Sequence, residues 1–186
     1  MRLFEIINAL ERTPVIAATD GRNWKTALIS EPEVLFHLNP NLLTVKAELA
    51  AAKKHRKIVF VHIDLADGIG KDKTGMEWLA SLGADGIIST RPHLIKVAKE
   101  AGFFTVQRFF ALDSKGMDSI DDTMINGMPD FAEIMPGVIP KVVERFAHTG
   151  IPIIAGGLIE TKTEVTAALG HGALAVSTGK QDLWLL

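Results

Sequence analysis

The sequence predicts a compact single-domain (β/α)8 barrel, the TIM-barrel fold, over residues 1–186. Short apolar runs alternate with helix-like segments, which is typical of parallel strands joined by helices. Eight strand–helix units follow one another at roughly 23 residues each, and this count favours a closed barrel. The alternative is an open flavodoxin-like parallel sheet, which is built from the same alternation.

The first half of the chain supplies an N-terminal helix and four strand–helix units. Residues 1–12 place Leu3, Ile6, Ile7 and Leu10 on one helical face. Each strand that follows is an apolar run, as expected of a strand that is buried on both faces of a parallel sheet. The expected strands are residues 14–19, 34–38, 58–63 and 84–90, and the expected helices are residues 23–29, 42–55, 74–82 and the segment after Pro92.

The second half repeats this pattern with one weaker crossover. Residues 115–128 are polar and interrupted by glycine, so we expect the least regular connection there. Thr161, with Glu164 three residues further on, is expected to cap the helix after the seventh strand. The expected strands are residues 103–112, 131–135, 151–155 and 173–178, and residues 180–186 form the beginning of a last helix.

The composition favours a soluble cytoplasmic protein. The chain has a formal net charge of −2 and no cysteine, so disulfides and thiol chemistry are excluded. No apolar run approaches the roughly 18 residues of a membrane span, and charges interrupt the N-terminal helix, so no membrane association is expected. The negative net charge argues against wholesale coating of nucleic acid, but it is compatible with a local basic face.

Small residues follow the last two predicted strands and indicate an anion site. Gly156 and Gly157 close one strand, and Ser177, Thr178 and Gly179 close the next. Glycine lets a ligand approach the backbone, and free N–H groups at two adjacent strand-to-helix turns form a cradle for an anion. This fold commonly holds phosphate at its last two strands. We therefore predict that these five residues bind a phosphate group.

Charged residues lie within or directly after five of the other predicted strands. Functional groups of a barrel gather at the carboxyl ends of its strands, so these side chains are expected to form a polar ring over the cradle. Such a ring suits a small phosphorylated molecule with hydroxyl groups, because carboxylates accept hydrogen bonds from hydroxyls. The predicted ring consists of Asp20, Asp64, Arg91, Arg108 and Glu133.

Structural roles remain open for several ring residues. Asp20 and Asp64 can serve as caps of the turns that follow them. Glu133 lies inside an apolar strand, so a purely structural role would require a buried partner such as Arg91 or Arg108.

The chain shows no signature of a metal or cofactor site. Its histidines are scattered without ligand spacing, and His62 is interpreted as a hydrogen-bonded core residue. No Walker loop, dinucleotide fingerprint or nucleophile elbow is present. An alternative function is that of a barrel isomerase or lyase, acting on a small phosphorylated metabolite with Glu133 as general base. No convincing acid partner for Glu133 is visible, which favours a protein that is not an enzyme.

Several motifs stand out along the chain, among them the run Ile88-Ser-Thr-Arg91, the run from Val106 to Ser114, and the apolar strand ending in Gly156-Gly157. With these motifs the chain resembles the glycerol uptake operon antiterminator regulatory proteins over nearly its whole length. The most particular of these motifs are the Ser-Thr-Arg run and the run from Glu133 to Lys141, which contains Pro-Gly-Val-Ile-Pro-Lys. The last is the run from Ala173 through Trp184.

The resemblance implies a regulator with a TIM-barrel-like fold. It implies a protein that responds to glycerol 3-phosphate or a similar small phosphate ester, and that binds the leader mRNA of glycerol-metabolism genes to prevent early transcription termination. A homo-oligomer is compatible with this function. No RNA-binding motif is visible, and the weak basic candidates for RNA contact are Lys53, Lys54, Arg56, Lys57, Lys71 and Lys73.

Overall fold

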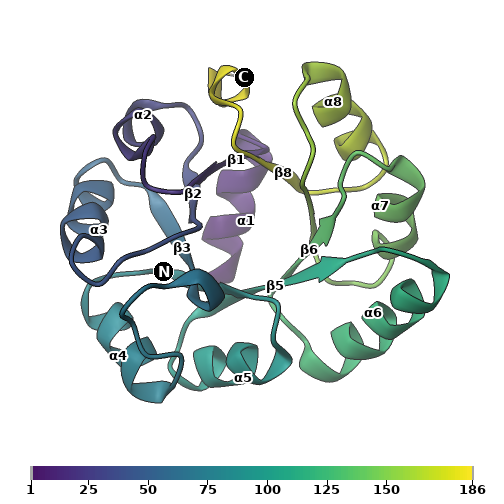
Figure 1. The fold of residues 1–186 in the computed structure, drawn as a ribbon. Helices are drawn as coiled ribbons and strands as arrows, with labels where there is room; N and C mark the ends of the chain where they lie inside the picture. Colours follow the sequence, from purple (N-terminus) through teal and green to yellow (C-terminus); the bar gives the residue numbers. More distant parts are fainter. Residues whose placement is uncertain (1, 186) are drawn as a thin grey trace.

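The computed structural model describes residues 2–185 as a closed barrel of parallel strands that pair in chain order (Figure 1). The predicted closed barrel is confirmed, and the open flavodoxin-like sheet is wrong because β1 also pairs with β8. The strands are β1 (Val15–Thr19), β2 (Val34–His37), β3 (Ile58–His62), β4 (Gly86–Ser89), β5 (Phe104–Phe110), β6 (Phe131–Met135), β7 (Ile153–Gly156) and β8 (Ala175–Thr178).

Helices surround the barrel on the outside, and one helix precedes it. The helices are α1 (Leu3–Arg12), α2 (Trp24–Ile29), α3 (Val45–Lys54), α4 (Lys73–Ser81), α5 (Pro92–Glu100), α6 (Ser114–Gly127), α7 (Pro140–Phe146) and α8 (Lys162–Gly170), with short 3-10 segments η1 (Ile63–Leu65) and η2 (Gln181–Leu185). The predicted cap of α8 is confirmed, since Thr161 Oγ1 accepts from the Glu164 N–H at 3.2 Å.

The crossover after β5 corrects the prediction of an irregular connection. Residues 114–127 form one continuous helix, α6. Asp113 caps its start by accepting a hydrogen bond from the Gly116 N–H at 2.7 Å. Ile120 and Met124, one helical turn apart, are buried against the barrel. The cap and this apolar pair outweigh the low helix propensity of its glycines.

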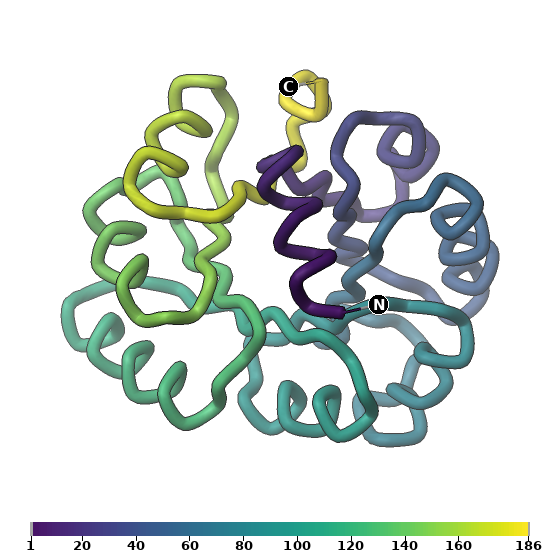
Figure 2. The backbone as a smooth tube through the Cα atoms, turned by 180° about the vertical axis from the view of Figure 1, so that it is seen from behind, coloured from purple at the N-terminus to yellow at the C-terminus, as the bar shows by residue number. Residues whose placement is uncertain are grey.

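The barrel interior is closed from the N-terminal side by α1. Ile6 and Leu10 of α1 are fully buried and pack with inward-facing side chains of the strands, among them Phe36, Phe60 and Phe131. The rings of Phe60 and Phe131 meet edge to face, with centroids 6.2 Å apart. Figure 2 shows α1 lying across this end of the barrel. The interior is thus apolar and is filled by side chains of α1 at the N-terminal end of the barrel. Polar groups can therefore gather at the C-terminal end.

The short segment η2 stands where an eighth outer helix would follow β8. It lies between α2 and α8 in Figure 1, near the C-terminus. Trp184 of η2 is buried, and its indole N–H donates to the Thr178 carbonyl at 2.9 Å. The expected last helix is therefore a single tight turn, anchored to the end of β8 by one tryptophan.

Alternation along the strands decides which residues face the open, C-terminal end of the barrel. Ile16, Ile88 and Val106 belong to the interior cluster. Because successive side chains point to opposite faces of a strand, the residue two positions after each of them also points inward, one layer higher. On β5 that residue is Arg108, which pairs in register with Glu133 of β6. This layer forms the floor of the site.

Within residues 2–185, no helix is long and apolar enough to cross a membrane.

The plug formed by α1 predicts a large stability loss when its apolar contacts are removed. Leu10→Ala empties space beneath the barrel interior, and we expect it to lower the free energy of unfolding by about 2–5 kcal/mol. Asn8→Ala, on the exposed side of α1, is the control and should change it by less than about 0.5 kcal/mol. Urea denaturation measures both. Equal losses in the two variants would contradict the role assigned to α1.

Candidate ligand-binding site

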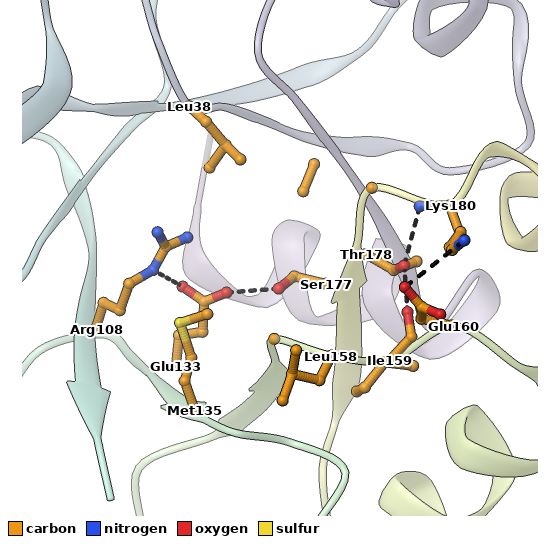
Figure 3. A pocket seen from close by; sticks show the side chains of 13 residues that line it. Leu38, Arg108, Glu133, Met135, Leu158, Ile159, Glu160, Ser177, Thr178 and Lys180 are labelled. Carbon is orange, nitrogen blue, oxygen red and sulfur yellow. Dashed lines mark hydrogen bonds and ion pairs between the residues drawn. The ribbon is translucent and has the colours of Figure 1, made fainter. Parts of the chain in front are cut away.

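A cavity opens at the carboxyl ends of β5 to β8, where the fold brings several predicted site residues together. Its volume is about 370 Å³, enough for a small metabolite. Arg108, Glu133, Gly157 and the run 177–179 all line it (Figure 3). Gly156, directly below Gly157, supports its floor. The two turns that sequence reasoning placed beside each other are neighbours, since Gly156 of β7 pairs in register with Ser177 of β8.

A buried carboxylate forms the floor of the cavity. Glu133 is fully buried, and one of its oxygens accepts from Arg108 Nε at 2.6 Å. Its other oxygen accepts from Ser177 Oγ at 2.5 Å. A buried charge needs such partners, and a guanidinium with a hydroxyl supplies both charge and hydrogen bonds. Figure 3 shows the terminal nitrogens of Arg108 turned away from Glu133. They remain free to meet a ligand.

Glycine is required at position 156 by this carboxylate. A Cβ on Gly156 would lie 2.4 Å from Glu133 Oε1 and 2.8 Å from Ser177 Oγ. Both distances are far below van der Waals contact. The absence of a side chain on β7 therefore makes room for the hydrogen bond between β6 and β8.

Backbone N–H groups without a protein acceptor gather at the two turns. Across residues 2–185, the amides of Gly157, Leu158 and Gly179 donate to no protein group. Gly157 and Leu158 have positive φ values of 77° and 61°, a left-handed conformation that residues with a Cβ rarely adopt. This conformation turns the chain sharply after β7. The result is a set of unpaired donors beside the cavity, the arrangement that binds anions.

The hydroxyls of the predicted cradle are already engaged by the protein. Ser177 donates to Glu133, and Thr178 Oγ1 donates to the Ile159 carbonyl at 2.8 Å. Thr178 Oγ1 also accepts from the Lys180 N–H at 3.1 Å. These side chains therefore hold the two turns together, and the groups left for a ligand are the amides.

Two charged residues at the cavity were missed by sequence reasoning. Lys180 and Glu160 both line it, with Lys180 Nζ 3.6 Å from Glu160 Oε1. Both side chains are more than half exposed, at 53% and 63%. The only signal in the sequence was that Lys180 follows Gly179 directly at the end of a strand. The side chain of Lys180 is thus an exposed cation that lines the same cavity as the unpaired amides.

Asp64 lies away from the cavity and holds the turn after β4. Its carboxylate accepts from Ser89 Oγ at 2.6 Å and from the N–H and hydroxyl of Thr90 at 2.7 and 2.8 Å. Burial by itself would raise the pKa of Asp64, but these hydrogen bonds outweigh it, so the pKa lies below its usual range.

Asp20 and Arg91 also stand apart from the residues that line the cavity. Asp20 pairs with the exposed Arg22, whose hydrogen bond lowers the pKa of the Asp20 carboxyl. Arg91 is the exposed N-cap residue of α5. Of the five predicted ring residues, the fold brings Arg108 and Glu133 together in the cavity.

His62 lies buried in the upper part of the barrel, with 3% of its surface exposed. Burial and the nearby charge of Arg108 lower the pKa of its imidazole, which favours the neutral form. Its Nδ1 has no hydrogen-bond partner among the described residues. The predicted burial of His62 is confirmed, and its Nδ1 is one ring atom to which the structure gives no hydrogen bond among the described residues.

Three of the six basic residues predicted to contact RNA already contact oxygen atoms of the protein. Lys57 Nζ donates to the carbonyls of Ser30 and Pro32 at 2.5 and 2.8 Å, and burial lowers its pKa. Lys71 Nζ donates to the Asp64 carbonyl at 2.6 Å, and Lys73 lies 3.8 Å from Glu77.

The other three candidates, Lys53, Lys54 and Arg56, are exposed at the end of α3. They lie at the N-terminal end of the barrel, opposite the cavity. In the part of the chain that the structure describes, no group of three or more His, Cys, Asp or Glu side chains is placed to hold a metal ion.

Comparison with known proteins assigns the family. A model of the glycerol-3-phosphate responsive antiterminators matches residues 15–184. The chain belongs to this family. The chain is 33% identical to the Escherichia coli (strain K12) protein YgcP, over 97% of this chain and 96% of that protein.

Solved structures agree with the assignment. The glycerol uptake operon antiterminator regulatory protein from Listeria monocytogenes str. 4b F2365 is 33% identical, with a TM-score of 0.84 over 92% of this chain and 95% of its own. An antiterminator-related protein from Thermotoga maritima MSB8 is 35% identical, with a TM-score of 0.82 over 92% and 98%. The aldolase QR15, at 13% identity and a TM-score of 0.72 over 94% and 93%, shares the fold alone.

The site does not favour the enzyme alternative. Glu133 is fully buried, and its two oxygens accept hydrogen bonds from Arg108 and Ser177, as expected of a carboxylate in a structural pair. The buried carboxylate forms an ion pair with Arg108.

The close packing of Gly156 against Glu133 predicts that adding a methyl group at position 156 destabilises the protein. Gly156→Ala should force Glu133 and Ser177 apart and lower the free energy of unfolding by about 1–3 kcal/mol through overpacking. Gly170→Ala, at the end of α8 with open space around its Cβ, should be neutral or slightly stabilising. Chemical denaturation compares them. A Gly156→Ala protein as stable as the wild type would refute this packing.

The lowered pKa of Asp64 predicts a pH-dependent contribution to stability. Its folded pKa lies below the unfolded value of about 3.9, so its stabilising effect is present above that pH and is lost on further acidification. The difference in unfolding free energy between wild type and Asp64→Asn should therefore be largest near neutral pH and shrink below about pH 4. Denaturation at several pH values measures it. A pH-independent difference would contradict the assignment.

Proposed function

We propose that this antiterminator binds glycerol 3-phosphate in the cavity at β5 to β8, and that the ligand controls its binding to leader mRNA. The observation that carries the proposal is the group of unpaired amides at Gly157, Leu158 and Gly179 in a chain of this family. A phosphate needs several donors at once, and backbone N–H groups at a strand-to-helix turn supply them. Lys180 adds a positive charge at the same place.

The rest of the cavity suits the glycerol part of the ligand. Arg108 is held at one nitrogen by Glu133, and its other nitrogens offer hydrogen bonds to hydroxyl oxygens. Ser177 and Thr178 take an indirect part, because they fix the turns that carry the amides. Gly156 makes the close packing of Glu133 possible. Asp20, Asp64 and Arg91 shape neighbouring turns in this proposal and do not contact the ligand.

The proposed ligand acts by preferring one arrangement of the two turns. Before binding, Lys180 lies near Glu160. A dianionic phosphate competes with that carboxylate for the same ammonium group and joins the turns after β7 and β8 through their amides. A ligand shifts a conformational equilibrium by its difference in affinity for the two states, and these contacts supply the difference. The chain acts in this scheme as a cytoplasmic regulator without catalysis.

A carboxylate introduced beside the amides should abolish ligand binding. We expect no heat of glycerol 3-phosphate binding to Gly157→Asp in calorimetry, because the new charge repels phosphate. Gly150→Asp, at another positive-φ glycine with open space around it, should bind as the wild type does. Lys180→Met should bind at least about tenfold more weakly, a loss of about 1.4 kcal/mol. Unchanged affinity in Gly157→Asp would overturn the proposed site.

Retention of leader RNA tests the regulatory part. The wild-type protein should retain the leader of a glycerol-metabolism transcript more strongly when glycerol 3-phosphate is present, over a series of salt concentrations. Gly157→Asp should lose this dependence on the ligand. A protein that retains no RNA at any salt, with or without ligand, would refute the antiterminator mechanism for this chain.

A further inference from the structure

The charges of the chain are distributed unevenly around the barrel. Residues 45–110, from α3 through β5, contain eleven lysine and arginine residues and seven acidic ones, a net charge of +4. The remaining residues contain nine basic and fifteen acidic residues, a net charge of −6. Because the elements follow one another around the barrel in chain order (Figure 1), the positive excess lies on one flank. A protein of net negative charge thus has a side that attracts polyanions.

Helix α5 carries several of the exposed cations of this flank, and Lys53, Lys54 and Arg56 at the end of α3 are others. Arg91, His93, Lys96 and Lys99 are all exposed, while the opposite face of the helix is buried. Within residues 2–185, Arg91, Lys96 and Lys99 form no ion pair with a carboxylate. The one acidic residue on the helix is Glu100, at its last position.

A groove runs between α5 and α6 beside these cations. Its volume is about 530 Å³, and His93, Lys96 and Lys99 line one wall. Thr123 and Asn126 line the other wall. Both walls therefore present hydrogen-bond donors, two of them charged, and Glu100 at the end of α5 adds one carboxylate to the lining. The groove is concave and rich in donors, which suits the phosphates and sugar hydroxyls of a single RNA strand.

The groove and the ligand cavity lie on two sides of one strand. Arg108 of β5 points into the cavity, and its neighbour Gln107 points outward, beneath α6. Gln107 Oε1 lies 3.2 Å from the position that a Cβ on Gly127 would occupy, and Gly127 lines the groove. Arg108 and the groove are thus separated by a single strand and the side chain of Gln107.

We propose that the groove between α5 and α6 is the surface that contacts leader RNA. This inference rests on the proposed function, and it names the RNA-contacting surface. It replaces the candidates at Lys57, Lys71 and Lys73, whose ammonium groups are engaged by neighbouring protein groups. The occupant is a single-stranded segment of RNA, held mainly through its phosphates.

Charge reversal on α5 with a matched control tests the surface. Lys96→Glu/Lys99→Glu changes the net charge by −4, as does Lys25→Glu/Lys141→Glu on exposed helix positions outside the positive flank. Fluorescence anisotropy with labelled leader RNA and saturating glycerol 3-phosphate measures affinity over a salt series. The α5 variant should lose at least about tenfold in affinity, and its salt slope should fall by about 1.4, for two lost phosphate contacts. The control should retain the wild-type slope.

Lys99 also contacts the carbonyl of Met128, so a single variant guards against a folding defect. Lys96→Glu leaves that contact in place and should lower the salt slope by about 0.7. Glycerol 3-phosphate calorimetry should give wild-type affinity for all three proteins. Equal losses in the α5 and control variants would overturn the groove while leaving the antiterminator function intact. Absence of RNA binding by the wild type would instead overturn the function, and the groove with it.

Discussion

The site depends on one buried carboxylate and the space that is left for it. Glu133 is held between Arg108 and Ser177, so a single side chain joins β5, β6 and β8 at the floor of the cavity. The pair can form because β7 carries no side chain at Gly156. Removing a partner of a buried charge is costly, so the three strands are fixed relative to one another. The position of the two turns above them follows from that constraint.

In the turns after β7 and β8, side-chain hydroxyls stabilise the structure, whereas backbone amides are available to a ligand. The sequence pattern predicts that the hydroxyls of Ser177 and Thr178 bind phosphate. In the structure they form hydrogen bonds within the protein that hold the turns, such as the bond from Thr178 to the Ile159 carbonyl. The backbone amides of Gly157, Leu158 and Gly179, which every residue type except proline could supply, donate to no protein group among the described residues. A site built in this way depends on backbone geometry more than on side-chain type. Lys180 supplies the charge that the amides lack, from an exposed position that lines the cavity.

The fold could be predicted from the sequence because strand–helix units recur at regular intervals along the chain. Parts of the site could not be predicted in this way. Alternating apolar runs gave eight strands, and a charged residue within a strand pointed to the pair formed by Glu133 and Arg108. The helix after β5 was missed, because its cap at Asp113 counts for more than the glycines in its sequence.

Residues that follow a strand cannot be assigned to the cavity from their position alone. Asp64 sits at such an end, yet turns toward the Thr90 backbone. Lys180 lies one residue beyond the strand-end glycine and reaches the cavity. The difference is set by the course of each loop in space, which the periodicity of the strands does not encode.

The central claim is that the free amides after β7 and β8 bind the phosphate group, and amide NMR tests it most directly. In a titration with glycerol 3-phosphate, the N–H resonances of Gly157, Leu158 and Gly179 should move together downfield and saturate at one common affinity. Inorganic phosphate should move the same three resonances, with weaker affinity. Saturable binding that leaves these three resonances in place would contradict the account.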